Sequence, residues 1–298
     1  MRILIEAIGS LVSGATIKRI KEAGHTCVGI DANKDCYARY LVDEFYQAPF
    51  ANDPSSKSFL FNLAVEKKID LVMASLDDGL LSWSEMRNEL LSHGVHLTLP
   101  SDDLLRTFLD KWSTYLFFKE AGIPTPETSL KQDYPLVKPR LGRGGDGIVI
   151  TDKPVDMTDM VSQELLKGTE YTTDVLCDIN SNPIYIVPRV RLGVKEGKST
   201  GGEVVNNAKI EQYIKQLCKK MNYVGAFNIQ CFEDDMKNIK FTELNPRLGG
   251  GTALGMAATE NWIPLLIDTF INNKVIKAST EVDYGLKMGR FYSEVYYK

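Results

Sequence analysis

Oxygen-bearing side chains cluster in a β-rich stretch in the last third of the chain. Glu243 and Asn245 are two residues apart in the segment IKFTELNP, so both side chains leave the same face of a strand. Gln230, in the preceding strand-like segment GAFNIQCFE, can point to that face too. One carboxylate and two amide carbonyls are oxygen ligands suited to Mg²⁺, which leaves its other positions to phosphate and water. Arg247 follows two residues later and could meet a phosphoryl oxygen.

A solvent-facing strand that ends at Pro246 is the alternative interpretation of Glu243 and Asn245. The apolar neighbours Phe241 and Leu244 indicate that the strand pair is buried on at least one side. Because buried polar side chains need partners, we favour the binding interpretation.

A second candidate is the glycine-rich segment KPRLGRGGDG over residues 138–147. Its glycines are Gly142, Gly144, Gly145 and Gly147. Glycines let backbone N–H groups approach a polyphosphate closely, and Lys138 adds a positive charge before the loop. Taken alone, the segment is equally compatible with a flexible hairpin loop.

The first hundred residues alternate between strand-like and helix-like segments. Strands are expected at residues 1–7, 26–30, 69–75 and 95–99, and helices at residues 15–23, 57–67 and 80–92. Short connections between such segments are typical of parallel βαβ units. We therefore expect a small doubly wound parallel-sheet domain over residues 1–100.

Two features of this first domain bear on ligand binding. The stretch GSLVSG at residues 9–14 lacks the GxGxxG pattern, so a dinucleotide site is rejected. Asp77 and Asp78 follow a strand at an end where such folds bind ligands. We favour a simpler explanation for them, an acidic pair stabilised at a helix N-terminus.

The rest of the chain is predicted to be α+β. Pro100-Ser101-Asp102 marks the boundary. Helices are expected at residues 104–120, 207–221 and 262–272, and strands at residues 171–178, 184–193, 225–233 and 239–246. The glycine-rich segment LGGGTALG, residues 248–255, is expected to be a flexible lining of the acceptor pocket or a simple turn.

The order and spacing of these segments resembles the ATP-grasp superfamily, with its carboxylate-amine ligases and carbamoyl-phosphate synthetase large subunits. The segments that carry the resemblance are DKWSTYLFFKEAGIPTPET, PLVKPRLGRGGDGI, QELLKGTEY and FTELNPRLGGG. The resemblance covers nearly the whole chain. It implies an ATP-grasp domain over residues 101–298, with a lid at about residues 124–163 and a C-terminal part at about residues 164–298.

The resemblance implies a role for each matched residue on the nucleotide side. Lys111 and Lys138 would hold the α- and β-phosphates under a lid loop formed by the four glycines at 142, 144, 145 and 147. Glu164 and Leu166 would meet the adenine edge through backbone groups, and Glu170 would hold the ribose hydroxyls.

The resemblance also implies a metal and an acyl-transfer site. Glu243 and Asn245 match metal ligands, and Gln230 matches a glutamine of carbamoyl-phosphate synthetases where other members have an acid. Arg247 would contact the γ-phosphate or an acyl phosphate. Arg189 and Arg191 share one strand face, and one of them is expected to contact the acyl phosphate or the substrate carboxylate. A solvated arginine pair is the alternative.

The implied activity is an ATP- and Mg²⁺-dependent ligase, with Mn²⁺ as an alternative metal. It would activate a small carboxylate, an amino acid among the candidates, as an acyl phosphate and join it to an amine, releasing ADP and phosphate. Two alternatives stay open: a kinase-like enzyme that forms an acyl or carbamoyl phosphate, and a non-catalytic nucleotide-binding protein. The family's full-size carbamoyl-phosphate synthetases contain two grasp units, whereas this chain has one. Carbamoyl phosphate synthesis is therefore not the favoured activity.

Composition narrows the class of protein further. The 298 residues carry a net charge of −4 and are 44% hydrophobic and 25% charged, which fits a globular protein and gives no broad basic surface for nucleic acid or membrane. The five cysteines form no CxxC pair, which predicts free thiols in a reducing, cytoplasmic compartment. The partners are expected to be small molecules, and a homodimer is left open.

Overall fold

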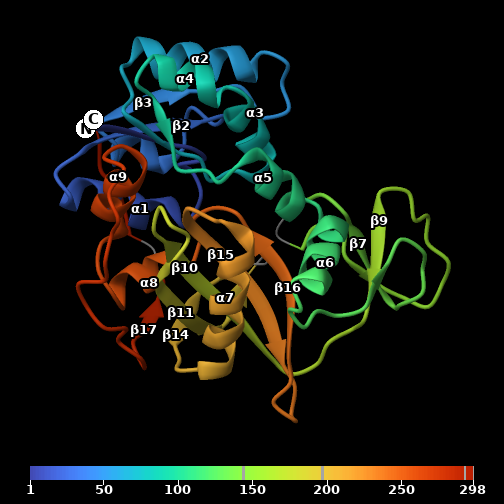
Figure 1. Ribbon diagram of the computed structural model, residues 1–298. Coiled ribbons are helices and arrows are strands. Elements are labelled where there is room, and N and C mark those ends of the chain that lie inside the picture. The colour runs from blue at the N-terminus through green and yellow to red at the C-terminus, as the bar shows by residue number, and fades with distance from the viewer. Residues whose placement is uncertain (143–144, 196–197, 292, 298) are drawn as a thin grey trace.

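The computed structural model describes residues 1–142, 145–195, 198–291 and 293–297 (Figure 1). Its first part is a five-stranded parallel sheet in the order β3-β2-β1-β4-β5. The strands are β1 (Arg2–Ile5), β2 (Thr26–Asp31), β3 (Glu44–Gln47), β4 (Leu71–Met73) and β5 (His96–Leu97). The strand order reverses between β1 and β4, and ligands bind beyond the carboxyl ends of the strands at such a reversal.

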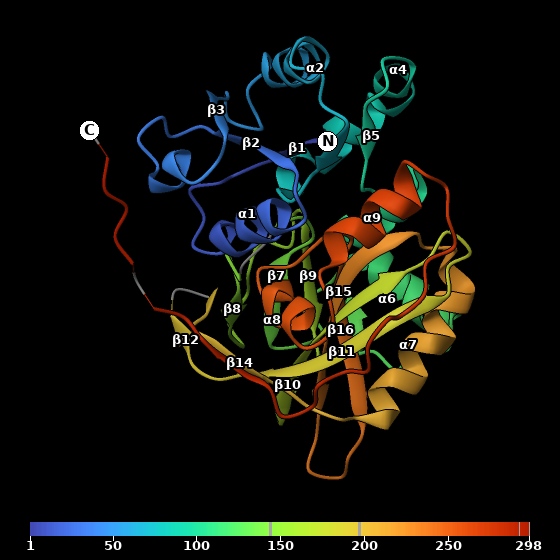
Figure 2. The same ribbon diagram turned by 90° about the vertical axis from the view of Figure 1, so that its left-hand side faces the viewer.

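Helices cover both faces of this sheet, as a doubly wound domain requires (Figures 1 and 2). Ile3 and Ile5 of β1 belong to one buried cluster with α1, whereas Leu4 belongs to another with α2. The helices are α1 (Ser13–Glu22), α2 (Ser56–Glu66), α3 (Leu80–Glu85) and α4 (Arg87–Ser92), with 3₁₀ turns η1 (Tyr37–Tyr40) and η2 (Asp77–Gly79). Alternate side chains of β1 thus pack against helices on opposite faces of the sheet, which explains why the whole strand is apolar.

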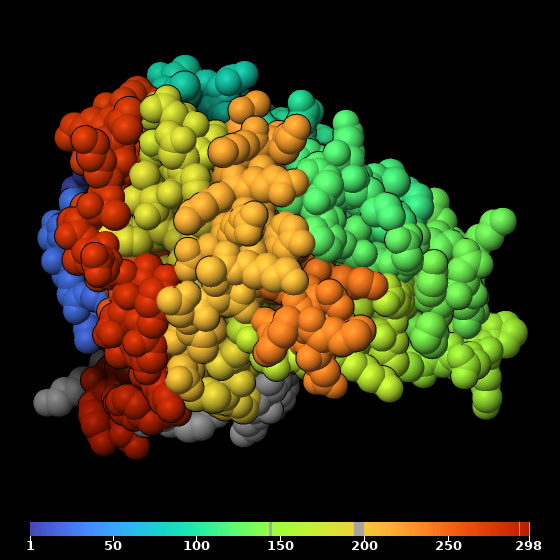
Figure 3. All heavy atoms as spheres, turned by 60° about the horizontal axis from the view of Figure 1, so that its bottom comes forward, coloured from blue at the N-terminus to red at the C-terminus, as the bar shows by residue number. Residues whose placement is uncertain are grey.

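A small antiparallel sheet projects from the body of the molecule (Figures 1 and 3). Its order is β6-β9-β7-β8. The strands are β6 (Thr128–Ser129), β7 (Leu136–Pro139), β8 (Val149–Ile150) and β9 (Met160–Gln163). Two helices, α5 (Asp102–Leu109) and α6 (Lys111–Glu120), precede it in the chain.

A six-stranded antiparallel sheet forms the centre, in the order β16-β15-β10-β11-β14-β17. Its strands are β10 (Thr169–Cys177), β11 (Pro183–Arg191), β14 (Gly201–Val204), β15 (Gly225–Glu233), β16 (Ile239–Asn245) and β17 (Lys287–Gly289). The short strands β12 (Val194–Lys195) and β13 (Lys198–Ser199) pair beside it.

Helices lie on both faces of the central sheet. The apolar side of α7 (Ala208–Met221) packs in a cluster with Phe227, Ile229 and Phe241. On the other face, α8 (Thr252–Ala257) and α9 (Trp262–Phe270) share a cluster with the first domain, where Trp262 is fully buried. This shared cluster fixes the parallel sheet over one end of the central sheet (Figure 2).

The fold class is as predicted, but several elements differ from the expectation. The helix expected at residues 80–92 is divided at Met86, and the strand β3 was not predicted. The helix expected at residues 104–120 is two helices, because Asp110 is extended (φ −101°, ψ 117°) and caps α6 by accepting the N–H of Trp112 at 2.9 Å. The segment at residues 248–255 is not simply a turn, since α8 begins at Thr252. None of the helices in the described ranges is both long and apolar enough to cross a membrane.

Candidate active site

Two neighbouring strands of the central sheet present amide and carboxylate side chains to one cavity. In the β15–β16 pair, Gln230 lies opposite Glu243 and Asn228 lies opposite Asn245. All four side chains line a cavity of about 620 Å³. We call these four residues the strand wall. The sequence predicted three of them to share a face, and the register places them so.

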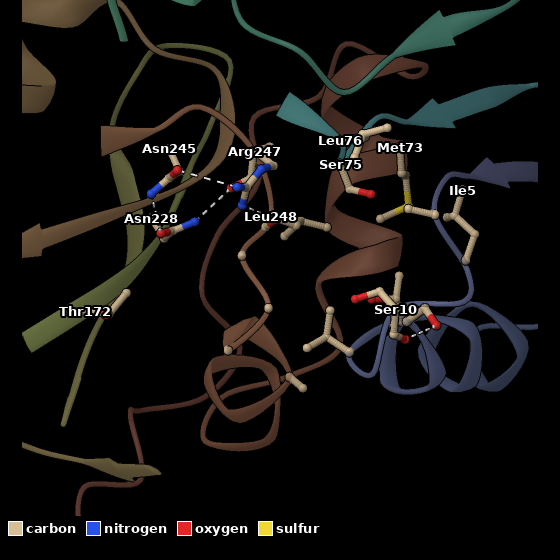
Figure 4. Close-up of a pocket in the computed structure, with 18 of the residues that line it drawn as sticks. Ile5, Ser10, Met73, Ser75, Leu76, Thr172, Asn228, Asn245, Arg247 and Leu248 are labelled. Atoms are coloured by element: carbon tan, nitrogen blue, oxygen red, sulfur yellow. Dashed lines mark hydrogen bonds between the residues drawn. The ribbon is translucent and has the colours of Figure 1, made fainter. Parts of the chain in front are cut away.

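Hydrogen bonds connect the side chains of the strand wall. The Asn245 side-chain nitrogen donates to Glu243 Oε1 at 3.1 Å and to Asn228 Oδ1 at 3.2 Å. Arg247 Nη2 reaches Asn245 Oδ1 at 3.4 Å. Figure 4 shows Arg247, Asn245 and Asn228 together on one side of the cavity, opposite Ile5, Met73 and Ser75. Because backbone pairing and side-chain bonds both hold these groups, their relative positions are set before any ligand binds.

Arg247 ties the strand wall to the first domain. Its Nε and Nη2 donate to the two carboxylate oxygens of Asp77 at 2.5 Å and 2.7 Å. Burial lowers the pKa of Arg247, but the hydrogen bond and charge of Asp77 outweigh it and leave that pKa above its ordinary value. Asp77 does lie in the first turn of η2, as the helix-terminus explanation requires. Its bidentate partner, 170 residues away, was not predicted.

The carboxyl ends of β1 and β4 form the opposite side of the cavity. Glu6 follows β1, and its carboxylate accepts the indole N–H of Trp83 at 2.7 Å and the backbone N–H of Ser75 at 3.1 Å. Burial raises the pKa of Glu6, and these donors offset part of that effect. This position at the strand-order reversal is where a ligand site is expected in a doubly wound sheet.

Two lysines approach Glu243 from the lid side. Lys138 on β7 is buried, and its Nζ donates to Gln163 Oε1 at 2.8 Å. Burial lowers the pKa of Lys138 to about 8, although the charge of Glu243 acts in the opposite direction. Lys111 Nζ donates to the carbonyl of Gly142 at 3.0 Å; burial lowers its pKa too, and again Glu243 opposes the shift. The charge of Glu243 therefore acts on both ammonium groups.

The glycine loop, residues 141–148, begins beside Lys111. Gly142, Gly145 and Gly147 have φ values of +122°, +78° and +71°, in the region that favours glycine. A Cβ at Gly147 would lie 2.8 Å from Pro139, so a larger residue there would also force the loop or Pro139 to shift. Gly144 lies outside the described residues. The backbone path at these three positions thus favours glycine, whatever the loop covers.

The candidate adenine and ribose residues lie around the turn from β9 to β10. The backbone N–H of Glu164 donates to the carbonyl of Glu127 at 2.9 Å, so a base could use only the carbonyl of Glu164. The Glu164 carboxylate pairs with Lys240 at 2.6 Å. Leu166 is half-buried, and Glu170 lies 3.5 Å from Arg191 Nη2. These three residues remain predictions.

Arg189 and Arg191 line the cavity but differ in their surroundings. Arg189 is buried, and its Nε donates to Asp174 at 2.7 Å. A Cβ at Gly251 would lie 2.2 Å from the Arg189 guanidinium, which explains a glycine there. The charge of Arg189 is already compensated, whereas Arg191 is more exposed and only loosely paired.

Three residues near the site were not assigned from sequence. Asn228 could have been found, because it precedes Gln230 by two residues on the same strand face. Gln163, the partner of Lys138, stands in a recognised segment but was given no role. The pairing of Asp77 with Arg247 has no local signal, since it depends on the packing of two domains.

Solved structures of two enzymes share the fold of this chain. A solved N5-carboxyaminoimidazole synthetase from Staphylococcus aureus, complexed with ADP, is 16% identical with a TM-score of 0.76, over 97% of this chain and 82% of that one. The biotin carboxylase domain of the Hydrogenobacter thermophilus 2-oxoglutarate carboxylase, with MgADP, ADP and bicarbonate, is 17% identical with a TM-score of 0.75, over 96% and 73% of the two chains. The fold is that of the ATP-grasp enzymes.

Sequence comparison supports the same assignment. Residues 156–291 match the family model described as ATP-grasp in the biosynthetic pathway with Ter operon. A carbamoyl-phosphate synthase of Methanobrevibacter smithii is 22% identical in an alignment of length 281, gaps included, that covers 84% of this chain and 75% of that protein. The family model covers less than half of the chain, and the likeness of the whole chain to ATP-grasp proteins is one of fold.

Proposed function

We propose that this protein is an ATP- and Mg²⁺-dependent ligase that activates a small carboxylate as an acyl phosphate and joins it to an amine. ADP and phosphate are the other products. The observation that carries the proposal is that Lys111 and Glu243 line one cavity at the end of the strand wall, where the charge of Glu243 also acts on the buried Lys138. Positive groups for a triphosphate and an oxygen ligand for its cation thereby meet at one place.

The donor set of the strand wall fits Mg²⁺. Glu243 supplies a carboxylate oxygen, and Asn245 and Gln230 supply amide oxygens beside it. In the described part of the chain no group of three or more His, Cys, Asp or Glu side chains could hold a metal. A single carboxylate with amides suits a cation that receives most of its ligands from phosphate and water. When bound, Mg²⁺ would neutralise charge that develops on the transferred phosphoryl group.

Positioning and charge stabilisation supply the catalysis in this mechanism. The substrate carboxylate attacks the γ-phosphorus of ATP, and the amine then displaces phosphate from the acyl phosphate. Lys111 and Lys138 hold the α- and β-phosphates, and Arg247 meets the phosphoryl group being transferred. The glycine loop covers the phosphates and excludes water, which would otherwise hydrolyse the acyl phosphate. No protein nucleophile is required.

The solved relatives support this class of reaction, its small-molecule substrates and a dimeric assembly. The two solved relatives were determined with ADP, one of them as a dimer with bicarbonate, a small carboxylate. We extend to this chain a small carboxylate and an amine as substrates, and a homodimer as its assembly. All five cysteines are free and buried, which supports a reducing, cytoplasmic location.

An ADP-release assay tests the proposal. The protein with MgATP is supplied with small acids, including amino acids and bicarbonate, each with and without a set of amines. We expect one acid to stimulate ADP release and an amide to form only when an amine is present. ADP release with an acid alone and a stable acyl phosphate as product would support the kinase-like alternative. A chain that binds MgATP but never releases ADP would contradict the proposed function.

A further inference from the structure

One carboxylate on the first-domain side of the larger cavity has no cationic partner. Glu6 directly follows β1, is buried and lines this cavity of about 620 Å³. Its hydrogen-bond donors are all neutral: the indole N–H of Trp83 at 2.7 Å, and the backbone N–H groups of Ser75 at 3.1 Å and Leu76 at 3.5 Å. In the described part of the chain, no lysine, arginine or histidine forms an ion pair with Glu6. An ionised Glu6 therefore has no compensating charge within that part of the protein.

The cations around this cavity belong to other groups. The second carboxylate that lines it, Glu243, acts on the two lysines of the lid side. The arginines come from the central sheet and from the segment after β17; they are Arg189, Arg191, Arg247 and Arg290. Figure 4 shows Arg247 across the cavity from Ile5 and Ser75, the chain neighbour and a hydrogen-bond donor of Glu6. The first-domain side of the cavity is therefore the side that can receive a cation.

The surroundings of Glu6 leave its carboxylate incompletely satisfied. A buried carboxylate without a counter-ion costs free energy, and burial accordingly raises the pKa of Glu6. The three N–H donors offset only part of that effect. A carboxylate can accept about four hydrogen bonds, so one position is left for a further donor. A donor with a positive charge would satisfy that position and stabilise the ionised form at the same time.

We propose that Glu6 binds the protonated amino group of the amine substrate. The inference rests on the proposed function and adds to it the binding site of the second substrate. An ammonium group carries a positive charge and N–H donors, which are the two features that the Glu6 carboxylate lacks in a partner. Glu6 is thus a specificity residue that selects an amine with N–H donors.

The backbone connects this subsite to the phosphoryl end of the cleft. Ser75 and Leu76, which donate to Glu6, directly precede Asp77, whose carboxylate pairs with Arg247. In the proposed mechanism Arg247 meets the phosphoryl group being transferred, so an amine at Glu6 would lie on the first-domain side of the acyl phosphate.

The lysine side of the cleft is separate from this subsite. It borders a second cavity of about 210 Å³, lined by Lys111, Gly142 and Glu243. Glu6 lines only the larger cavity. A nucleotide phosphate held by the lysines would therefore leave Glu6 free for the amine.

Thermal unfolding of the full chain with MgADP tests the subsite without turnover. Methylammonium chloride is the probe, and tetramethylammonium chloride keeps its charge without an N–H donor. Relative to the second salt at equal concentration, methylammonium should raise the unfolding midpoint of the wild type by about 1–3 °C. Glu6→Gln should lose this difference, and Glu22→Gln, on α1 of the same domain, should keep it. Equal midpoints in the two salts, or an unchanged difference in Glu6→Gln, overturn the proposal.

Two further measurements separate binding from a purely structural role of Glu6. Trp83→Phe removes a donor but keeps the carboxylate, so it should unfold at a lower temperature and retain the methylammonium difference. Loss of that difference in Trp83→Phe as well would show that Glu6 acts only through the fold. A crystal structure of the wild type with MgADP and benzylammonium chloride needs no variant. The amino nitrogen should lie within hydrogen-bond distance of Glu6, and a ligand bound elsewhere contradicts the proposal.

Turnover of Glu6→Gln gives a second test, with the acid and amine from which the wild type forms an amide. Glutamine keeps the shape of the side chain but loses the charge, so the half-saturating amine concentration should rise about tenfold or more. The KM for MgATP should stay within about twofold, and Glu22→Gln should match the wild type in both constants. A rise in the KM for MgATP alone contradicts the proposal. If the wild type releases no ADP with any acid, the proposed function fails, whereas the unfolding and crystal results still decide whether the subsite exists.

Discussion

The two sides of the catalytic cleft are built in opposite ways. The strand wall lies on paired strands of the central sheet, where backbone register and side-chain hydrogen bonds fix each group. The glycine loop instead joins two strands of the projecting sheet, β7 and a two-residue β8, and three of its glycines have positive φ. One side is held by paired strands, whereas the backbone path of the other depends on glycines at positive φ.

This difference separates two kinds of effect. In the proposed mechanism, groups on the fixed side would act on the charge that develops during phosphoryl transfer, so their loss should lower kcat. Groups on the lid side would hold ground-state phosphates in that mechanism, so their loss should raise the KM for MgATP. The substitutions below test that division.

Glu243→Gln should have the largest effect. The substitution keeps the shape of the side chain but removes the only carboxylate of the strand wall, so kcat should fall by roughly 10³-fold. Steady-state ADP release measures it, with circular dichroism to show that the fold is intact. Glu203→Gln, on β14 of the same sheet and outside the cavity, is the matched control. Normal turnover of Glu243→Gln would show that the metal assignment is wrong.

Lys138→Met should instead act on nucleotide binding. Loss of a buried ammonium that meets phosphate should raise the KM for MgATP by roughly 10- to 100-fold with a smaller change in kcat. A loss confined to kcat would break the division between the two sides of the cleft.

The pH dependence of binding sharpens this prediction. The pKa of Lys138 is about 8 in the free protein, so its side chain is charged below that pH and neutral above it. Phosphate groups favour the charged form, so MgADP affinity should fall as the pH rises from about 7 to about 9.5. Titration calorimetry measures the affinity, and Lys138→Met should lose this component of the pH profile. Identical pH profiles for the two proteins would exclude Lys138 as the titrating group.

Asp77→Asn tests how the fixed side depends on the first domain. The substitution leaves Arg247 largely buried without its counter-ion, which should cost about 1–3 kcal/mol of unfolding free energy and about tenfold in kcat. Urea unfolding and ADP release measure the two effects. A double-mutant cycle with Arg247→Lys should give clearly non-additive energies, because the two side chains are in direct contact. Additive energies would show that the pair does not position Arg247.

The sequence predicted the strand wall correctly because strand alternation is a local pattern. It predicted the contacts around the strand wall less well. Strand β15 has the predicted bounds, and the two-residue alternation correctly put Gln230, Glu243 and Asn245 on one face. The break at Asp110 was missed because the segment is helix-like on both sides. Asp110 is extended, caps α6 through the N–H of Trp112 and also pairs with Arg140, which lies 30 residues further along the chain. The Asp77–Arg247 pair and the position of Arg290 depend on tertiary packing, which no local pattern encodes.

Gly147→Ala should give the smallest effect and bears on the lid side alone. Alanine would need φ +71° and would place its Cβ 2.8 Å from Pro139, so the loop must shift, at a cost of about 1 kcal/mol. Gly14→Ala is the matched control, because Gly14 lies within α1 with nothing near its Cβ position and should gain about 0.5–1 kcal/mol. Thermal unfolding with and without MgADP measures both. If the loop serves the nucleotide, Gly147→Ala should also lose part of the stabilisation that MgADP gives, and Gly14→Ala should keep it all. Equal nucleotide stabilisation in the two variants would show that the loop path is a requirement of folding and has no part in closing the cleft.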